Sequence, residues 1–239
     1  MLEIKKVYKT YGEKIALNQV SMKLDNGVYG LLGPNGAGKS TLMNIITDNL
    51  IMDGGEILYN NENIKKLGKE FLKEIGFAPQ QQGLYDEFTG RRFLSYMGTL
   101  KGIHKKELKL EIERVSEAVN LAKELDKKMG AYSGGMKQRI LIAQAIMGKP
   151  KILIMDEPTA GLDPKERVRI RELLGDMSKD KTILIATHVV SDIQSISKEI
   201  IMIKQGNIVE KGTPDELVES YAKGGNLEDV YMKLFGGGE

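Results

Sequence analysis

Nine consecutive residues have the types and spacing that bind the phosphates of a nucleotide. They match the phosphate-loop pattern G-x-x-x-x-G-K-[ST] and read Gly33-Pro34-Asn35-Gly36-Ala37-Gly38-Lys39-Ser40-Thr41. Because glycine has no Cβ, the backbone N–H groups of such a loop can turn inward and approach phosphate oxygens. Lys39 can then reach the β- and γ-phosphates, and the Ser40 hydroxyl can ligate Mg²⁺. The loop therefore predicts a nucleotide phosphate site that includes Mg²⁺.

Two adjacent carboxylates follow an apolar run at residues 152–155. A buried strand there would deliver Asp156 and Glu157 to its C-terminal end, where ligands bind in open α/β sheets. Asp156 is suited to hold Mg²⁺ through water, and Glu157 is suited to polarise the attacking water as a general base. The alternative is an acidic pair that caps a helix after Pro158. The phosphate loop in the same chain favours the catalytic interpretation.

A serine and two glycines, Ser133-Gly134-Gly135, precede an apolar run at residues 140–147. In isolation, they predict no more than a helix that Ser133 caps at its N-terminus. The phosphate loop and the carboxylate pair in the same chain favour a functional role for these residues over the purely structural one.

The elements around the phosphate loop predict an α/β fold. Residues 28–32 predict a strand before the loop, and residues 39–49 predict a helix after it. Residues 152–155 and 183–186 are wholly apolar, as expected of strands buried on both faces of a parallel sheet. Asp25-Asn26-Gly27 predicts a hairpin turn. Further strands are predicted at 4–8, 20–24, 56–59, 75–78, 199–204 and 208–211.

Helical spacing without strand signals predicts an inserted helical subdomain at residues 81–150, with helices at 88–100 and 105–123. A further helix is expected at 164–179, with Pro164 in its first turn. The expected organisation is one domain, 1–239, with a P-loop NTPase core of mixed or parallel sheet and an N-terminal antiparallel β part. Its parts are a RecA-like core with the β part at 1–80 and 151–220, the insertion, and a C-terminal helix with a flexible glycine-rich tail at 221–239.

The composition excludes several classes of protein. Of the 239 residues, 41% are hydrophobic and 28% are charged, and the net charge of +2 comes from interleaved acidic and basic residues. Without a basic stripe, nucleic acid is not expected as a partner. The absence of cysteine excludes disulfides and cysteine-ligated metals. No apolar run reaches about 18 to 20 residues, and the first residues lack a signal-peptide core. Membrane contact is therefore expected only through another protein.

Together, the motifs resemble those of the ATP-binding cassette (ABC) family over residues 2–219. The resemblance is to the nucleotide-binding subunit of a bacterial ABC transporter, most like the exporter (ABC-2) type. It implies an ATPase with ATP and Mg²⁺ as cofactors. It also implies that Tyr11 stacks on adenine. The alternative is that Tyr11 is an aromatic residue at a strand end that packs on the core. Gln80 would contact Mg²⁺ and sense a membrane partner, with Gln81 and Gln82 as alternatives for that role.

The resemblance extends to the segment that begins with Tyr132. In the family, the signature serine and glycines bind the γ-phosphate held by the opposite subunit, and Ser133, Gly134 and Gly135 match them. Tyr132 stands where leucine is usual, and the residue after Gly135 is methionine where glutamine is usual. Because the Ser-Gly-Gly core is intact, the resemblance implies a site shared between two subunits.

Two later segments complete the resemblance. Gly161-Leu162-Asp163 resembles the D-loop that crosses the dimer interface, with a simple turn before a helix as the alternative. His188 resembles the switch histidine that contacts the γ-phosphate. The implied reaction is phosphoryl transfer to water, in which Glu157 acts as the base while His188 and Lys39 stabilise charge.

The resemblance implies two protein partners. One is a second copy of the chain or a homologous ABC subunit, and the other is an integral membrane permease that would hold the chain at the cytoplasmic face of the cell membrane. The permease would dock beside residues 84–89, where Tyr85 is expected at the surface and Thr89 as a helix N-cap. Most of Phe88, Phe93, Met97 and Leu100 are expected in the insertion's own core. Export is the expected direction, and a soluble ABC ATPase that drives iron–sulfur cluster assembly is the alternative.

Overall fold

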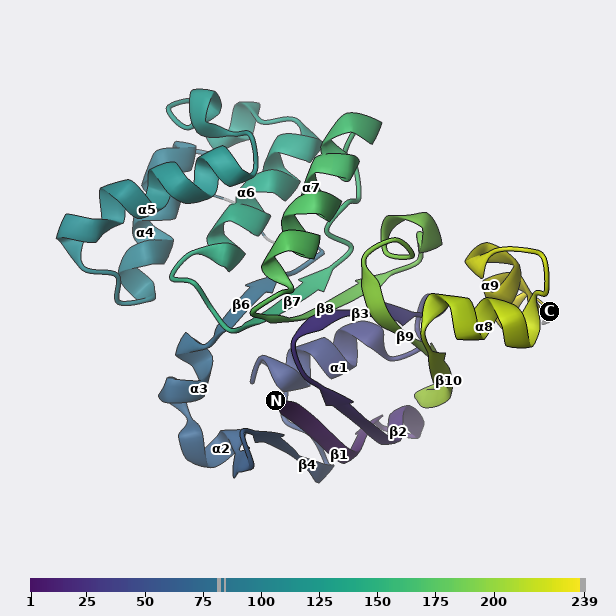
Figure 1. Cartoon of the computed structure of the whole chain (residues 1–239). Helices are drawn as coiled ribbons and strands as arrows, with labels where there is room; N and C mark the ends of the chain where they lie inside the picture. The colour runs from purple at the N-terminus through teal and green to yellow at the C-terminus, as the bar shows by residue number, and fades with distance from the viewer. Residues whose placement is uncertain (81–82, 84, 237–239) are drawn as a thin grey trace.

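Two β-sheets with helices between and around them make up the molecule (Figure 1). The computed structural model describes residues 1–80, 83 and 85–236. The strand order is β10-β9-β3-β8-β7-β6 in the larger sheet and β2-β1-β4-β5 in the smaller sheet. The predicted α/β class is confirmed, since a mostly parallel sheet with helices is combined with an antiparallel sheet near the N-terminus.

The larger sheet is parallel except at one edge, where β10 (Asn207–Gly212) pairs antiparallel with β9. Its parallel strands are β3 (Gly27–Leu32), β6 (Ile75–Ala78), β7 (Ile152–Asp156), β8 (Thr182–Thr187) and β9 (Ser197–Lys204). Every residue of β7 and β8 is buried. The apolar runs predicted this, because helices cover both faces of a parallel sheet.

The smaller sheet is antiparallel and packs against the larger one through a helix. Its strands are β1 (Leu2–Tyr11), β2 (Lys14–Leu24), β4 (Gly54–Tyr59) and β5 (Glu62–Asn63). The helix is α1 (Lys39–Ile46), whose Leu42 lies in one apolar cluster with Ile4 of β1 and Ile154 of β7. It ends before residue 49, where the sequence predicted its end, because Asp48 has a φ of +58°.

The predicted hairpin at Asp25-Asn26-Gly27 is wrong. Strands β2 and β3, on either side of it, belong to different sheets. The turn is held from outside: the Asp25 carboxylate accepts hydrogen bonds from the Tyr29 hydroxyl and from the Lys198 ammonium, the latter at 2.5 Å. Gly27 has a φ of +140°, and a Cβ there would lie 2.8 Å from Cδ of Lys198. The glycine signal therefore marks a crossing between sheets.

Helices α4 (Gly90–Leu100), α5 (Lys105–Ala118) and α6 (Gly134–Ile146) gather at one end of the larger sheet (Figure 1). As predicted, no named strand lies among the described residues between 83 and 150. Thr89 caps α4, because its hydroxyl accepts a hydrogen bond of 3.2 Å from the N–H of Arg92. Helix α5 ends before residue 123, since Asn120 has a φ of +54°.

The helical part shares one apolar core with the sheet, in which Phe93 and Ile140 lie with Leu153 of β7. Phe88 and Met97 are half-buried against this core. Leu100 departs from that pattern and is exposed.

The remaining helices lie along the outside of the sheets. They are α2 (Ile64–Leu67), α3 (Lys69–Lys73), α7 (Pro164–Met177), α8 (Pro214–Tyr221) and α9 (Leu227–Phe235), with short 3-10 turns at Ala122–Glu124, Met129–Ala131 and Val190–Asp192. Pro164 occupies the first turn of α7, as predicted. Helix α8 was not predicted, although Thr213 and Glu216 form a capping box that the sequence signals. The predicted tail at 237–239 lies outside the described residues. Within the part of the chain that the structure describes, no helix has the length and apolar character needed to cross a membrane.

Candidate functional site

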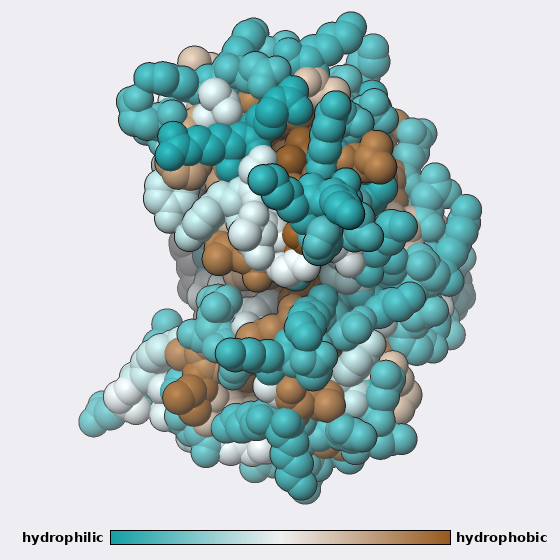
Figure 2. All heavy atoms as spheres, turned by 90° about the vertical axis from the view of Figure 1, so that its left-hand side faces the viewer, coloured by the Kyte–Doolittle hydropathy of each residue, from teal (hydrophilic) through white to brown (hydrophobic). Residues whose placement is uncertain are grey.

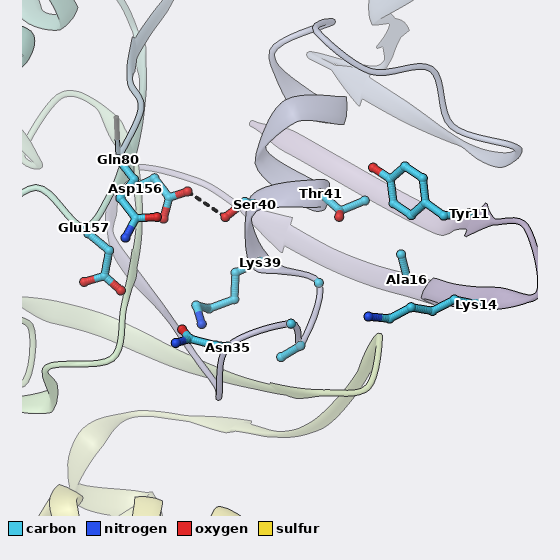
Figure 3. A pocket seen from close by; sticks show the side chains of 13 residues that line it. Tyr11, Lys14, Ala16, Asn35, Lys39, Ser40, Thr41, Gln80, Asp156 and Glu157 are labelled. Carbon is cyan, nitrogen blue, oxygen red and sulfur yellow. Dashed lines mark hydrogen bonds between the residues drawn. The ribbon is translucent and has the colours of Figure 1, made fainter. Parts of the chain in front are cut away.

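A pocket of about 190 Å³ opens where β7 ends and α1 begins (Figure 3). It brings together segments that are far apart in the sequence: the end of β1, the phosphate loop, the end of β6 and the end of β7. Its walls are formed by Tyr11, Lys14, Ala16, Asn35, Gly36, Ala37, Gly38, Lys39, Ser40, Thr41, Gln80, Asp156 and Glu157. Most residues that the sequence assigned to ATP and Mg²⁺ therefore line one cavity.

The phosphate loop lies close against the smaller sheet before it enters α1. Gly38 has a φ of +110°, and a Cβ at this position would lie 2.5 Å from the carbonyl oxygen of Ala16. Neither the conformation nor the space admits a side chain. Gly33 and Pro34 do not line the cavity, but their carbonyls belong to the loop that encloses it. Glycine is therefore required at residue 38 for the loop to turn at the N-terminus of α1.

Lys39 is buried inside the phosphate loop. Its ammonium donates hydrogen bonds of 2.6 Å and 3.1 Å to the carbonyl oxygens of Gly33 and Pro34. Burial lowers the pKa of Lys39, and the charges of Glu157 and Asp156 oppose that shift. Since its bonded partners are neutral carbonyls, the ammonium retains a charge that an anionic ligand in the loop would balance.

The hydroxyl of Ser40 donates a hydrogen bond of 2.7 Å to Oδ2 of Asp156 (Figure 3). Burial raises the pKa of Asp156; the charge of Glu157 acts in the same direction, while the Ser40 hydroxyl and the Lys39 charge oppose it. Gln80 lines the same cavity. A hydroxyl, a carboxylate and an amide oxygen are hard donors of the kind that Mg²⁺ prefers, so this set of residues fits that ion. Gln81 and Gln82, the alternatives to Gln80, lie outside the described residues.

Glu157 is buried and holds the segment that follows β8. Its Oε2 accepts a hydrogen bond of 2.9 Å from the Thr187 hydroxyl, and its Oε1 accepts one of 3.1 Å from the backbone N–H of His188. Nδ1 of His188 lies 2.7 Å from the same Oε1. Glu157 has a φ of +51°, a costly conformation for this residue type, and its own N–H donates to the carbonyl of Ala186 at 2.8 Å. The strand end thus aims the carboxylate at His188.

His188 and Tyr11 keep much of their surface exposed. The His188 side chain is 58% exposed and is held by Glu157, although it does not itself line the cavity. Tyr11 is 52% exposed at the mouth of the cavity, so its ring does not pack in the core as the alternative interpretation required. An aromatic ring with a free face can stack on a planar base.

The signature residues lie outside this cavity. Ser133 caps α6, since its hydroxyl accepts a hydrogen bond of 3.2 Å from the N–H of Met136. Ser133 and Gly134 are exposed, and a Cβ on Gly135 would lie 3.2 Å from the carbonyl oxygen of Gly161. Asp163, two residues further on, caps α7. One chain therefore carries the phosphate loop and the signature on separate surfaces.

Sequence reasoning missed three residues of the site. Lys14 and Ala16 line the cavity, because β2 begins at Lys14 and not near residue 20 as predicted. The signal that could have found them is the apolar run Ile15-Ala16-Leu17, which comes shortly before the predicted strand at 20–24. Thr187 is the third, and its role follows from its bond to Glu157.

Comparison with known proteins agrees with this geometry. A family model described as ABC transporter matches residues 17–160, more than half of the chain. The chain is 37% identical to the uncharacterized ABC transporter ATP-binding protein YxlF of Bacillus subtilis (strain 168), over 91% of this chain and 72% of that protein. It is 34% identical to the Nod factor export ATP-binding protein I of Rhizobium sp. (strain N33), over 99% of this chain and 77% of that protein.

A solved structure of similar shape is the ATP-binding cassette MJ0796, described as dimeric, in a post-hydrolysis state and bound to ADP and Pi. The TM-score is 0.82 and the identity 28%, over 89% of this chain and 98% of that one. The phosphate loop, the carboxylate pair and the family match therefore agree. The chain belongs to the ABC transporter family and is an ATP-binding, ATP-hydrolysing member of it.

Proposed function

We propose that this chain is the ATPase subunit of an exporter, which dimerises around two ATP molecules and drives a separate membrane permease. The observation that carries the proposal is the meeting of Lys39, Ser40, Asp156 and Glu157 at one cavity. The similarity to the Nod factor export ATP-binding protein supports the outward direction.

Each residue of the cavity has its own role in binding. The Tyr11 ring stacks on adenine, while the N–H groups of the phosphate loop and the Lys39 ammonium bind the β- and γ-phosphates. Ser40, Asp156 and Gln80 are the residues that would hold Mg²⁺, which when bound neutralises charge on the phosphates. The hydrogen bond between Ser40 and Asp156 supports this role, because it already places the two oxygen donors side by side.

Hydrolysis transfers the γ-phosphoryl group to water. Glu157 orients the water and accepts its proton as the water oxygen bonds to the γ-phosphorus. The bond between that phosphorus and the bridging oxygen breaks, and ADP leaves with the electron pair. His188 and Lys39 stabilise charge on the γ-phosphate. The contacts of Glu157 with Thr187 and His188 support its part as the base, because they hold the carboxylate in one orientation.

A second subunit completes each site. Ser133, Gly134 and Gly135 bind the γ-phosphate held by the opposite chain, and Asp163 lies at the interface between the two subunits. Their position outside the cavity of their own chain supports this arrangement, as does the dimeric form of the MJ0796 cassette. A lone subunit is therefore expected to hydrolyse ATP slowly, and a homodimer would have two equivalent sites.

The permease docks on the face that carries α3 and α4. Three aromatic residues gather there: the Tyr85 ring stacks on Phe88 at 4.9 Å between centroids, and Tyr96 meets both rings edge-on. Figure 2 shows this face, where apolar side chains are exposed on both sides of a hollow. Tyr85 and Tyr96 are exposed, so they are available to a partner. The chain would thus be held at the cytoplasmic face of the membrane.

In this proposal, the whole chain is one ABC ATPase domain. Residues 1–80 and 151–220 form the ATP-binding core with the β part, and residues 81–150 form the helical subdomain that carries the signature. The apolar cluster that α4 and α6 share with the larger sheet supports one domain rather than two.

Purification of tagged chain from detergent-solubilised native membranes tests the proposal. Mass spectrometry identifies the co-purifying chains, and ATP hydrolysis is measured in the same preparation for the wild type and for Glu157→Gln. A stoichiometric multi-span protein and hydrolysis that the variant lacks are expected. Recovery of soluble partners alone, with hydrolysis intact, would move the function to a cytosolic assembly ATPase. Wild-type hydrolysis by Glu157→Gln would instead refute the assignment of the base.

A further inference from the structure

A buried carboxylate, Asp192, lies four residues after His188 and outside the nucleotide cavity. It is 4% exposed, and its Oδ2 accepts a hydrogen bond of 2.5 Å from the hydroxyl of Thr159. The guanidinium of Arg167 lies 3.9 Å from the same oxygen. A buried carboxylate is costly unless it is bonded in this way, so these contacts hold Asp192 in place.

The bond between Thr159 and Asp192 completes a ring of contacts that includes Glu157 and His188. Thr159 lies two residues after Glu157 at the end of β7, and Asp192 lies four residues after His188 at the end of β8. The two segments are joined at one end by Nδ1 of His188 and Oε1 of Glu157, 2.7 Å apart, and at the other by the bond between Thr159 and Asp192. Movement of either segment therefore changes the position of His188 relative to Glu157.

The same ring is attached to the segment that leads into α7. Nε of Arg167 donates a hydrogen bond of 3.2 Å to the carbonyl oxygen of Leu162, the residue before Asp163. Arg171, one turn further along α7, donates a hydrogen bond of 2.9 Å to the carbonyl oxygen of Ser191. Two arginines of one helix thus contact both segments, Leu162 in one and Ser191 and Asp192 in the other, so that the segment at 161–163 and the segment after His188 move together.

We propose that Asp192 is a positioning residue, which through Thr159 and Arg167 sets the place of His188 and couples it to the segment at 161–163. The inference rests on the proposed function, in which His188 contacts the γ-phosphate and Asp163 lies at the dimer interface. Asp192 touches no substrate. A change at the interface would reach His188 through the Thr159–Asp192 bond, and a broken bond would leave the histidine poorly placed while ATP still binds.

Removal of the Thr159 hydroxyl tests this role. Thr159→Val keeps the size and branching of the side chain and removes the donor to Asp192, whereas Thr159→Ser keeps the donor. For Thr159→Val, we expect kcat to fall about 10- to 100-fold, because a small misplacement of a catalytic group has effects of this size. The Kd for ATP should stay within about threefold of the wild type, and Thr159→Ser should restore kcat.

Thr182→Val is the matched control. Thr182 is also buried, and its hydroxyl donates a hydrogen bond of 2.7 Å to the backbone carbonyl oxygen of Asp25, at the opposite end of β8 from His188. This variant should keep the wild-type kcat. Should Thr159→Val fail to fold, Asp192→Asn serves as the second test, since it removes the charge that faces Arg167 and keeps the side-chain size.

Combination with His188→Ala separates positioning from a structural role. If Asp192 acts through the histidine, the double variant Thr159→Val/His188→Ala should be no slower than His188→Ala alone. The inference would be overturned if the double variant lost kcat by the product of the two single-variant factors. It would also be overturned if Thr159→Val kept the wild-type kcat while His188→Ala was slow. Both results would leave the proposed function intact. A wild-type kcat for His188→Ala would overturn the proposed role of the histidine and the inference with it.

Discussion

The hydroxyl of Ser40 and the carboxylate of Asp156 meet at 2.7 Å across 116 residues of sequence. This bond ties the first turn of α1 to the end of β7, so the phosphate loop and the carboxylate pair have one fixed relationship. Since β7 is a strand of the larger sheet and α1 packs against that sheet, the fold itself forms the cavity between them. The predictions for ATP binding and hydrolysis depend on this arrangement.

Glu157→Gln is expected to stop turnover and preserve ATP binding. The amide keeps the size of the side chain and can still accept a bond from His188, but it cannot take the proton of water. Loss of a general base costs about 10²- to 10⁴-fold in kcat. Steady-state hydrolysis and an ATP titration measure the two effects, and size-exclusion chromatography with ATP should reveal a trapped dimer. A monomer that binds ATP normally would contradict the shared site.

Lys39→Ala is expected to weaken ATP binding itself. Hydrogen bonds to charged groups contribute about 1.5–3 kcal/mol, so the Kd should rise about 10- to 100-fold. Isothermal titration with ATP and Mg²⁺ measures the change. Lys66→Ala, on the exposed side of α2, is the matched control and should bind ATP as the wild type does. Equal affinities for the two variants would refute the phosphate-loop role of Lys39.

Tyr11 is expected to bind adenine through its ring and not through its hydroxyl. Stacking on a base contributes about 1–3 kcal/mol, so Tyr11→Ala should raise the Kd for ATP about 5- to 100-fold. Tyr11→Phe keeps the ring and should stay within about twofold of the wild type. A fluorescence titration with an ATP analogue compares the three proteins. An unchanged Kd for Tyr11→Ala would mean that adenine is bound elsewhere.

The tyrosine before the signature requires a glycine at the start of α4. The Tyr132 hydroxyl donates a bond of 2.8 Å to the carbonyl of Glu124, and a Cβ on Gly90 would lie 2.3 Å from that hydroxyl. Burial raises the pKa of Tyr132 to about 12. Gly90→Ala is expected to lower the free energy of unfolding by about 1–3 kcal/mol through overpacking.

Tyr132→Phe distinguishes this clash from a backbone effect. Alone, it should cost about 1 kcal/mol for the lost hydrogen bond. In its background, Gly90→Ala should cost less than in the wild type, because the oxygen that the new methyl group meets is gone. Urea denaturation of the four proteins gives the coupling. Additive losses would show that the residues do not interact.

Stability is expected to rise in mild alkali because of Lys101. Its ammonium donates hydrogen bonds to the carbonyls of Ala145 and Met147 at the end of α6. Burial lowers the pKa of Lys101 from 10.5 to about 8, against a smaller opposing effect of Glu111. Between these two values the unfolded chain binds more protons than the folded chain, so the free energy of unfolding increases as pH rises through the window.

Lys101→Met removes this contribution. The wild type should gain up to about 3 kcal/mol relative to the variant between about pH 7 and about pH 10. Urea denaturation at both pH values measures the difference. Lys105 is exposed at the start of α5, and the free energy of unfolding of Lys105→Met should depend on pH as that of the wild type does. A difference that does not vary with pH would mean that Lys101 keeps an ordinary pKa.

Local signals were enough to predict the parts of the site that lie at strand ends. The wholly apolar runs that became β7 and β8 predicted buried parallel strands. Asp156, the last residue of β7, and His188, the first residue after β8, were therefore expected at one edge of the sheet. The phosphate loop was equally readable, because its chemistry depends on residue types at fixed spacing.

Relationships between distant segments could not be predicted in this way. The Asn26-Gly27 turn has hairpin chemistry, yet β2 and β3 separate because each finds its hydrogen-bonding partners in a different sheet. Lys14 reaches the cavity because β2 starts early, beside the phosphate loop. Such outcomes depend on which strands pair, and pairing is a property of the whole chain.

By itself, the sequence determined which chemistry the chain carries, since a phosphate loop, a carboxylate pair and a signature serine are defined by residues a few positions apart. The tertiary structure decided which of these groups share a cavity and which face outward. It placed Asp156 against Ser40, and it left Ser133 on a separate surface. It also buried Asp192 against Thr159, a contact between two loops that no local pattern records. The physical reason is that parallel strands bring distant segments together at their carboxyl ends, where packing selects the contacts.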